Sequence, residues 1–99
     1  GDPEGIALYK CGENDGVWIF TDQSHNRNRF HLFDRKSLEY LETFVMSQTT
    51  NTDGIRLTQK PTGRFSDGVF CALNNDKNLS VVNVSSFKEA MPNLFRCDG

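Results

Sequence analysis

Two short segments of this 99-residue chain place carboxylates directly before a glycine that opens an apolar run. The first is Asp2–Leu8 (DPEGIAL), and an acid-Gly-Ile-x-Leu segment returns as Asp53–Leu57 (DGIRL). The apolar runs predict β-strands, so the acids are expected at strand entrances, where a turn leaves backbone carbonyls free. Calcium prefers carboxylate and carbonyl oxygens as ligands. The pattern therefore predicts a site for a hard cation at the two strand entrances.

The elements that must position these acids form two similar units. In the first unit the expected strands are Glu4–Tyr9, Gly16–Thr21, Arg29–Phe33 and Leu38–Met46. Alternating or continuous apolar residues bounded by turn residues carry this prediction, and Asp15-Gly16 is typical of a hairpin turn. The second strand is apolar throughout, so we expect it to be central and covered on both faces. The first unit is predicted to be a four-stranded antiparallel meander.

The pattern restarts after a polar connector at residues 47–51. The expected strands of the second unit are Gly54–Leu57, Gly68–Ala72 and Leu79–Val82. No fourth strand follows. Ser86–Met91, closed by Pro92, is predicted to be a short helical turn with Ser85 or Ser86 as its cap.

A repeat of about 50 residues is the period of a propeller blade. The fold class expected is therefore all-β, a β-propeller fragment of about two four-stranded antiparallel blades. The first blade spans residues 1–47, an incomplete second blade spans 51–84, and a helical turn and tail span 85–99. Propellers need about four to eight blades to close. We therefore expect either further propeller blades or self-association to complete the fold.

Composition excludes some classes of protein. The net charge is −2, with 13 Asp and Glu against 11 Lys and Arg, and no basic block occurs. This composition argues against nucleic acid or a membrane surface as a partner. No apolar run approaches the roughly 18 residues that span a bilayer, and the first residues show no secretory signal.

The three cysteines have no metal-binding spacing. Cys71 lies in an apolar strand and is expected to be a small buried hydrophobe. A disulfide between Cys11 and Cys97 would form only in a secreted protein whose ends meet, and the sequence leaves that alternative open.

Several segments resemble the β-propeller phytases, six-bladed calcium-dependent enzymes that release phosphate from inositol hexakisphosphate. Asp2-Pro3-Glu4-Gly5-Ile6 resembles the family's Asp-x-Glu-Gly segment, and Gln23 falls where the family has the Gln of its Ser-Ser-Gln-Gly-Asn strand end. Asn51–Ile55 is similar to its Thr-Asp-Gly-Ile segment, and Phe65–Phe70 is similar to its Pro-x-Gly-Leu-Phe stretch. The similarity keeps register over roughly residues 1–90 and implies the C-terminal part of such a propeller.

The resemblance implies a calcium-dependent phosphomonoesterase acting on phytate, secreted or periplasmic. The calcium ligands it implies are Asp2, Glu4, Gln23, Asp53 and the backbone of Gly54. Bound calcium would make an acidic site a phosphate receptor and activate water for hydrolysis, so Asp2, Glu4 and Asp53 would be the catalytic residues.

Three cations are candidates for contacts with phosphate. Arg27 and Arg29 flank the Gln23 loop and could bind a phosphate group in bidentate fashion. Lys60 could add positive charge from another loop. A solvated loop is the alternative interpretation for each of them.

The chain also departs from the family. Ser24 replaces a Gly, Arg56 stands where the family has a second acid, and Asn78–Val82 does not match the Gln-Asn-Phe-Lys motif. Two alternatives therefore stay open. One is a non-catalytic, calcium-stabilised propeller binding module, and the other is a propeller lactonase-like hydrolase, because acidic strand entrances also occur in such folds.

The aromatic residues of the strands are expected to fill the core: Trp18, Phe20, Phe30, Phe33 and Phe70. His25 is expected on a loop surface and His31 on a strand face. Neither histidine belongs to a metal-binding motif, and no GxSxG elbow for a nucleophilic serine occurs.

Overall fold

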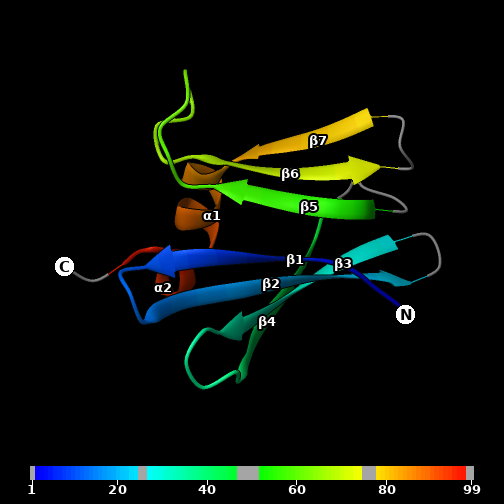
Figure 1. The fold of residues 1–99 in the computed structure, drawn as a ribbon, viewed down its shortest axis with the longest axis horizontal. Coiled ribbons are helices and arrows are strands. Elements are labelled where there is room, and N and C mark those ends of the chain that lie inside the picture. Colours follow the sequence, from blue (N-terminus) through cyan, green and yellow to red (C-terminus); the bar gives the residue numbers. More distant parts are fainter. Residues whose placement is uncertain (1, 25–26, 47–51, 75–77, 98–99) are drawn as a thin grey trace.

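The computed structural model describes residues 2–24, 27–46, 52–74 and 78–97. Within these ranges, residues 2–4, 23, 24, 27, 52, 53, 74 and 78 are described by their backbone alone. The fold is mostly β, as predicted, and consists of a four-stranded and a three-stranded antiparallel sheet (Figure 1). None of the described helices is long and apolar enough to cross a membrane.

The first sheet is the predicted meander, with the strands in the order β1-β2-β3-β4. Its strands are β1 (Asp2–Cys11), β2 (Asp15–Ser24), β3 (Arg27–Asp34) and β4 (Tyr40–Val45). The last strand begins two residues later than predicted because a turn precedes it. There the Asp34 carboxylate accepts hydrogen bonds from the backbone N–H groups of Lys36 and Ser37, and Leu38 adopts a left-handed φ of 63°.

The second sheet has the order β5-β6-β7 and, in the described part of the chain, no fourth strand, as predicted. Its strands are β5 (Thr52–Thr58), β6 (Val69–Asn74) and β7 (Asn78–Asn83), followed by α1 (Val84–Ala90) and α2 (Pro92–Phe95). The predicted cap of the helical turn was wrong, because Asn83 caps α1. Its side-chain oxygen accepts a hydrogen bond from the backbone N–H of Ser85 at 3.0 Å, which satisfies one of the free donors of the first turn.

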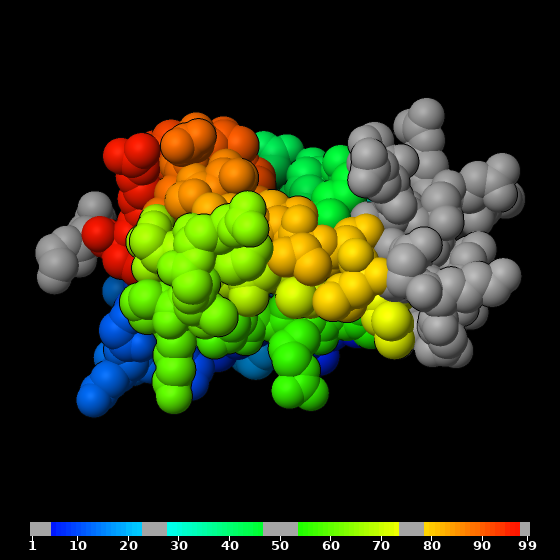
Figure 2. Space-filling view, turned by 90° about the horizontal axis from the view of Figure 1, so that it is seen from above, coloured from blue at the N-terminus to red at the C-terminus, as the bar shows by residue number. Residues whose placement is uncertain are grey.

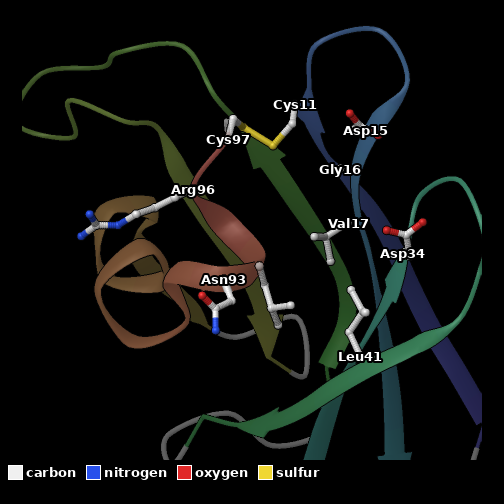
Figure 3. A pocket seen from close by; sticks show the side chains of 10 residues that line it. Cys11, Asp15, Gly16, Val17, Asp34, Leu41, Asn93, Arg96 and Cys97 are labelled. Atoms are coloured by element: carbon white, nitrogen blue, oxygen red, sulfur yellow. A yellow bond between two sulfur atoms is a disulfide. The ribbon is translucent and has the colours of Figure 1, made fainter. Parts of the chain in front are cut away.

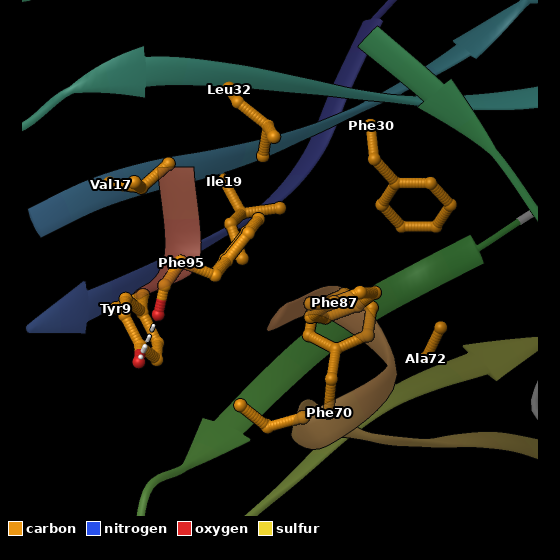
Figure 4. Close-up of a cluster of buried hydrophobic side chains, with 10 residues drawn as sticks. Tyr9, Val17, Ile19, Phe30, Leu32, Phe70, Ala72, Phe87 and Phe95 are labelled. Carbon is orange, nitrogen blue, oxygen red and sulfur yellow. Dashed lines mark hydrogen bonds between the residues drawn. The ribbon is translucent and has the colours of Figure 1, made fainter. Parts of the chain in front are cut away.

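The two sheets meet along β1 and β5, which lie side by side and point the same way in Figure 1. The core lies between the sheets and is closed by the two helices, as Figure 4 shows. The Phe87 ring of α1 contacts the Phe44, Phe70 and Phe95 rings, with centroids 5.1–5.5 Å apart. The helices therefore connect both sheets through one aromatic cluster.

The prediction for the aromatic core was right for two residues and wrong for three. Phe30 and Phe70 are fully buried. Trp18, Phe20 and Phe33 are only half-buried, because the strand alternation places them on the face of the first sheet that points away from the second sheet. The second strand is therefore central in its sheet but covered fully on one face only.

The C-terminal segment returns to the first sheet, and this arrangement settles the open question about the cysteines. Cys11 and Cys97 form a disulfide with their Cα atoms 5.4 Å apart. Next to it, the buried Tyr9 hydroxyl donates a hydrogen bond to the Phe95 carbonyl oxygen at 2.8 Å. Cys71 is a free thiol and is half-buried, so it is less enclosed than predicted. Partial burial raises the pKa of this thiol.

The long β5–β6 loop is also tied to the C-terminal part. The Lys88 ammonium of α1 lies 3.3 Å from the Asp67 carboxylate of the loop. In Figure 2 the loop and α1 lie against each other at one end of the molecule. The sequence analysis placed Lys60 in a loop, and the structure confirms this, with an isolated β-bridge between Thr62 and Phe65.

Candidate metal centre

The starts of β1 and β5, where the predicted ligands lie, form one end of the molecule. Asp2 pairs with Gln23 in the register of β1 and β2, so the backbones of these two predicted ligands are direct neighbours. Asp53 precedes Gly54 in β5 as Glu4 precedes Gly5 in β1. The antiparallel β1–β2 pairing brings Gln23, which is distant in sequence, to the entrance of β1.

Each of the two strand entrances contains an irregularity at its acidic residue. The β1–β2 register shifts between Pro3 and Gly5, which places Glu4 at the shift. The β5–β6 register shifts between Thr52 and Gly54, which places Asp53 at the shift. A β-bulge leaves its extra residue outside the regular ladder, so its backbone groups are free for another partner.

The two entrances approach each other closely, and a glycine makes this approach possible. A Cβ atom at Gly5 would lie 3.1 Å from both the Ile55 backbone nitrogen and its Cγ1 atom, and 3.5 Å from the Gly54 Cα. A Cβ atom at this position would require Ile55 to shift by a few tenths of an ångström. The absence of a side chain at Gly5 therefore brings the Glu4 and Asp53 bulges into one neighbourhood.

The predicted phosphate-binding residues separate into two groups. Arg29 is exposed on β3 opposite Asp22, and Arg27 pairs in register with Ser24, so both lie toward the end that holds Gln23. Lys60 follows the opposite end of β5. At about 3.3 Å per strand residue, the five strand steps from Asp53 to Thr58, the last residue of β5, correspond to roughly 17 Å. The structure therefore does not bring Lys60 to this end.

The described side chains hold no cluster of three or more potential metal ligands. Asp2, Glu4, Gln23 and Asp53, which the sequence predicts as ligands, are described by their backbone alone. The strand register and the contact between Gly5 and Ile55 therefore show that the backbones of these residues lie near one another. His25 lies outside the described residues.

The sequence did not reveal a polar cluster on the outer face of the first sheet. His31 Nε2 lies 3.3 Å from Asp22 Oδ2, and His31 Nδ1 lies 2.8 Å from Thr43 Oγ1, which is 2.7 Å from the Tyr40 hydroxyl. These residues come from three neighbouring strands, so only the register of the sheet brings them together. The hydrogen bond from His31 lowers the pKa of Asp22 and outweighs the opposing effect of burial.

A cavity of about 320 Å³ opens at the other end of the first sheet, beside the disulfide (Figure 3). Val17, Leu41 and Leu94 contribute its apolar lining, with Asp15 and Asp34 nearby. Both carboxylates already have partners in the protein. Asp15 lies 3.4 Å from Lys36 Nζ, and Asp34 accepts hydrogen bonds from the β3–β4 turn, chiefly from Ser37, which lower its pKa. This cavity holds none of the predicted site residues.

Comparisons with known proteins returned no match to any family model, curated protein or solved structure.

Proposed function

We propose that this chain carries part of the metal site of a calcium-dependent phosphomonoester hydrolase that acts on phytate. The observation that carries the proposal is the close approach of two acidic bulges, at Glu4 and Asp53, across the contact between Gly5 and Ile55. The resemblance of the same segments to the β-propeller phytases supports the substrate class.

The chemistry of the donor set fits calcium. Asp2, Glu4, Gln23 and Asp53 offer carboxylate and amide oxygens, and the bulges leave backbone carbonyls such as that of Gly54 available. Calcium accepts six to eight oxygen ligands in flexible geometry. Donors from β1 and β5, together with Gln23 of the neighbouring strand β2, therefore suit it. When bound, calcium would supply charge for phosphate binding and activation of water.

The residues of this chain have separate roles in the proposal. The three acids Asp2, Glu4 and Asp53 would hold the metal, and the Gln23 amide would complete its ligand set from β2. Arg27 and Arg29 would orient phosphate groups by bidentate hydrogen bonds, because the register places their backbones near the same end of the sheet. Lys60 has no role in this site.

The propeller fold belongs to the same proposal. Two antiparallel sheets that meet along their first strands, with the remaining strands leading away, are what neighbouring propeller blades would present. In such a fold the acidic strand entrances face a common central opening. Two blades leave that opening incomplete, so further blades or further copies of the chain would complete the site.

A second candidate function is a calcium-stabilised binding module without turnover. Arg56 favours it, because an exposed cation stands two residues after Gly54 where the family resembled has a second acid. One positive charge in place of a negative one would weaken a calcium site and reduce the number of metals held.

The experiment is a calcium titration by calorimetry, followed by an assay of phosphate release from calcium phytate with and without a chelator. Asp53→Ala is expected to weaken calcium binding about tenfold or more, because ligand charge sets calcium affinity. Asp15→Ala is the matched control, since Asp15 also precedes a glycine but lies at the opposite end of the first sheet.

Three outcomes separate the candidates. Calcium-dependent release that Asp53→Ala abolishes and Asp15→Ala preserves supports the hydrolase. Calcium binding without turnover by a natural protein with all its blades supports the binding module. Unchanged calcium affinity in Asp53→Ala, or no calcium binding at all, overturns the metal centre.

A further inference from the structure

The two sheets are copies of one structural unit, and two glycines make the correspondence definite. Gly16 and Gly68 both have positive φ values, 145° and 103°. A Cβ atom at Gly16 would lie 2.1 Å from the Tyr9 carbonyl oxygen, and one at Gly68 would lie 2.1 Å from the Thr58 carbonyl oxygen. The same backbone contact therefore opens the second strand of each sheet, so β1, β2 and β3 of the first sheet correspond to β5, β6 and β7 of the second.

This correspondence defines two faces for each sheet. The front face of the first sheet carries Ile6, Leu8, Trp18, Phe20 and Phe33, and the equivalent residues of the second sheet are Ile55, Leu57, Phe70, Ala72 and Val82. The back face of the first sheet carries Ile19, Thr21, Phe30 and Leu32, and the equivalents in the second sheet are Cys71, Leu73, Leu79 and Val81.

Within the chain, the back face of the first sheet packs on the front face of the second. Phe30 of the former meets Phe70 of the latter with ring centroids 5.7 Å apart, and both side chains are fully buried. The other two faces have no cover in the described structure. One is the front face of the first sheet and the other is the back face of the second.

The uncovered faces expose apolar side chains whose equivalents are buried, and each also carries an exposed arginine, Arg29 on the front face of the first sheet and Arg56 on the back face of the second. Leu79 and Val81 are 55% and 47% exposed, whereas the equivalent Phe30 and Leu32 are fully buried. On the front face of the first sheet, Ile6 is 52% exposed, whereas its equivalent Ile55 packs against the core. Contiguous apolar surface of this kind marks an interaction site on a protein.

We propose that the back face of the second sheet docks on the front face of the first sheet of another copy of this chain. The contact would repeat between copies the packing that already exists within one copy. The two docking faces differ, so the association is head-to-tail and closes into a ring if the rotation per copy allows it. With two sheets per chain and about four to eight sheets in closed propellers, such a ring would hold about two to four copies.

The polar cluster around His31 on the front face of the first sheet is compatible with burial. His31 already hydrogen-bonds with Asp22 and Thr43, and Thr43 with Tyr40, so docking would cover groups that have protein partners. The proposal rests on the repeat and on burial, and it does not depend on the metal centre.

The test uses two charge substitutions at exposed positions, which leave the core of each chain intact. Ile6→Arg blocks the front face, Val81→Arg blocks the back face, and Leu38→Arg is the control, because Leu38 is 63% exposed in the β3–β4 turn and belongs to neither face. Multi-angle light scattering gives the mass of each species relative to the 11.2 kDa chain, and circular dichroism confirms folding. Val45, which pairs with Arg29 on the front face and is 46% exposed, gives a second pair with Leu79 of the back face, as Val45→Arg and Leu79→Arg, if either variant fails to fold.

The expected result is an oligomer for the unmodified chain and for Leu38→Arg, and a monomer for each face variant alone. An equimolar mixture of the two face variants should form a dimer and nothing larger, because each supplies the face that the other lacks. A monomer at all concentrations, as expected if another protein or a further chain segment covers these faces, overturns the proposal. An oligomer that survives both substitutions, or a homodimer of either variant, also overturns it. Neither result depends on calcium, so failure here is distinguishable from failure of the metal centre.

Discussion

The chain leaves the third strand of each sheet through a similar turn, but the element that follows the turn differs between the two sheets. Asp34 ends β3 and Asn83 ends β7, and each side chain accepts a hydrogen bond from a backbone N–H two residues later. After Asp34, Leu38 adopts a left-handed φ and the chain reverses into β4. After Asn83 no residue of α1 has a positive φ, so the turn continues as a helix. One capped turn thus leads to a strand or a helix, depending on the residues that follow.

The different continuations still reach the same core. Phe44 of β4 and Phe87 of α1 pack against each other, with ring centroids 5.3 Å apart. The first sheet supplies its share of this cluster from a fourth strand and the second sheet from a helix. A strand in one unit and a helix in the other thus each contribute one ring to the same aromatic cluster.

The Cys11–Cys97 disulfide, which ties the C-terminal segment to the first sheet, has no counterpart among the described residues of the second sheet. Cys97→Ser is expected to lower the free energy of unfolding by about 4 kcal/mol, because the disulfide closes a loop that spans 86 positions. Urea denaturation followed by circular dichroism measures the loss. Cys71→Ser is the control in the second sheet and should cost about 1 kcal/mol or less, since this thiol is free and half-buried. Equal losses of stability in Cys97→Ser and Cys71→Ser would contradict the assignment of a Cys11–Cys97 disulfide and a free Cys71.

The glycine pair tests whether the sheets are equivalent. Gly16→Ala and Gly68→Ala should each lower the free energy of unfolding by about 3 kcal/mol, because the new Cβ atom meets a carbonyl oxygen and the backbone φ is positive. Gly12→Ala, at φ 73° with open space around the added atom, should cost about 1 kcal/mol. Chemical denaturation of the three variants checks the order. A loss at Gly68 as small as that at Gly12 would break the equivalence.

Removal of the Asn83 cap is expected to change the free energy of unfolding least, and it directly tests the similarity between Asn83 and Asp34. Asn83→Ala should cost about 1 kcal/mol, because the first turn of α1 loses an acceptor. Asn83→Asp should retain the stability, since a carboxylate already serves this purpose at Asp34. Ser86→Ala, at one of the positions that the sequence suggested as the cap, should change stability by less than about 0.5 kcal/mol. Thermal unfolding of the three variants measures these differences, and a larger loss for Ser86→Ala than for Asn83→Ala would refute the cap.

Local sequence patterns predicted the elements well and their surroundings less well. Alternating apolar residues and the glycine-rich turns located every strand of the described residues, and the second sheet lacks a fourth strand within them, as predicted. The cap of α1 was missed because serine and asparagine have similar preferences at that position. The cluster of Asp22 with His31 was missed because its members lie on separate strands and meet only through register.

For the candidate site, the sequence identified the acids before the two glycines, and their spacing along the chain is local information. The close approach of Gly5 to Ile55 depends on how the sheets pack, which residue types alone do not specify. The placement of Lys60 beyond the far end of β5 follows instead from the length of that strand, which is local information.

The sequence by itself determined where strands, turns and the helical segment form, because these depend on neighbouring residues and on a repeat of two along a strand. Only the tertiary structure decided which of two apolar faces became the core. Trp18 and Ile19 are both apolar, yet Ile19 is buried and Trp18 is not, because the second sheet covers only one side of the first. The tertiary structure likewise paired Cys11 with Cys97, since a bond between residues so far apart requires the fold to bring them together.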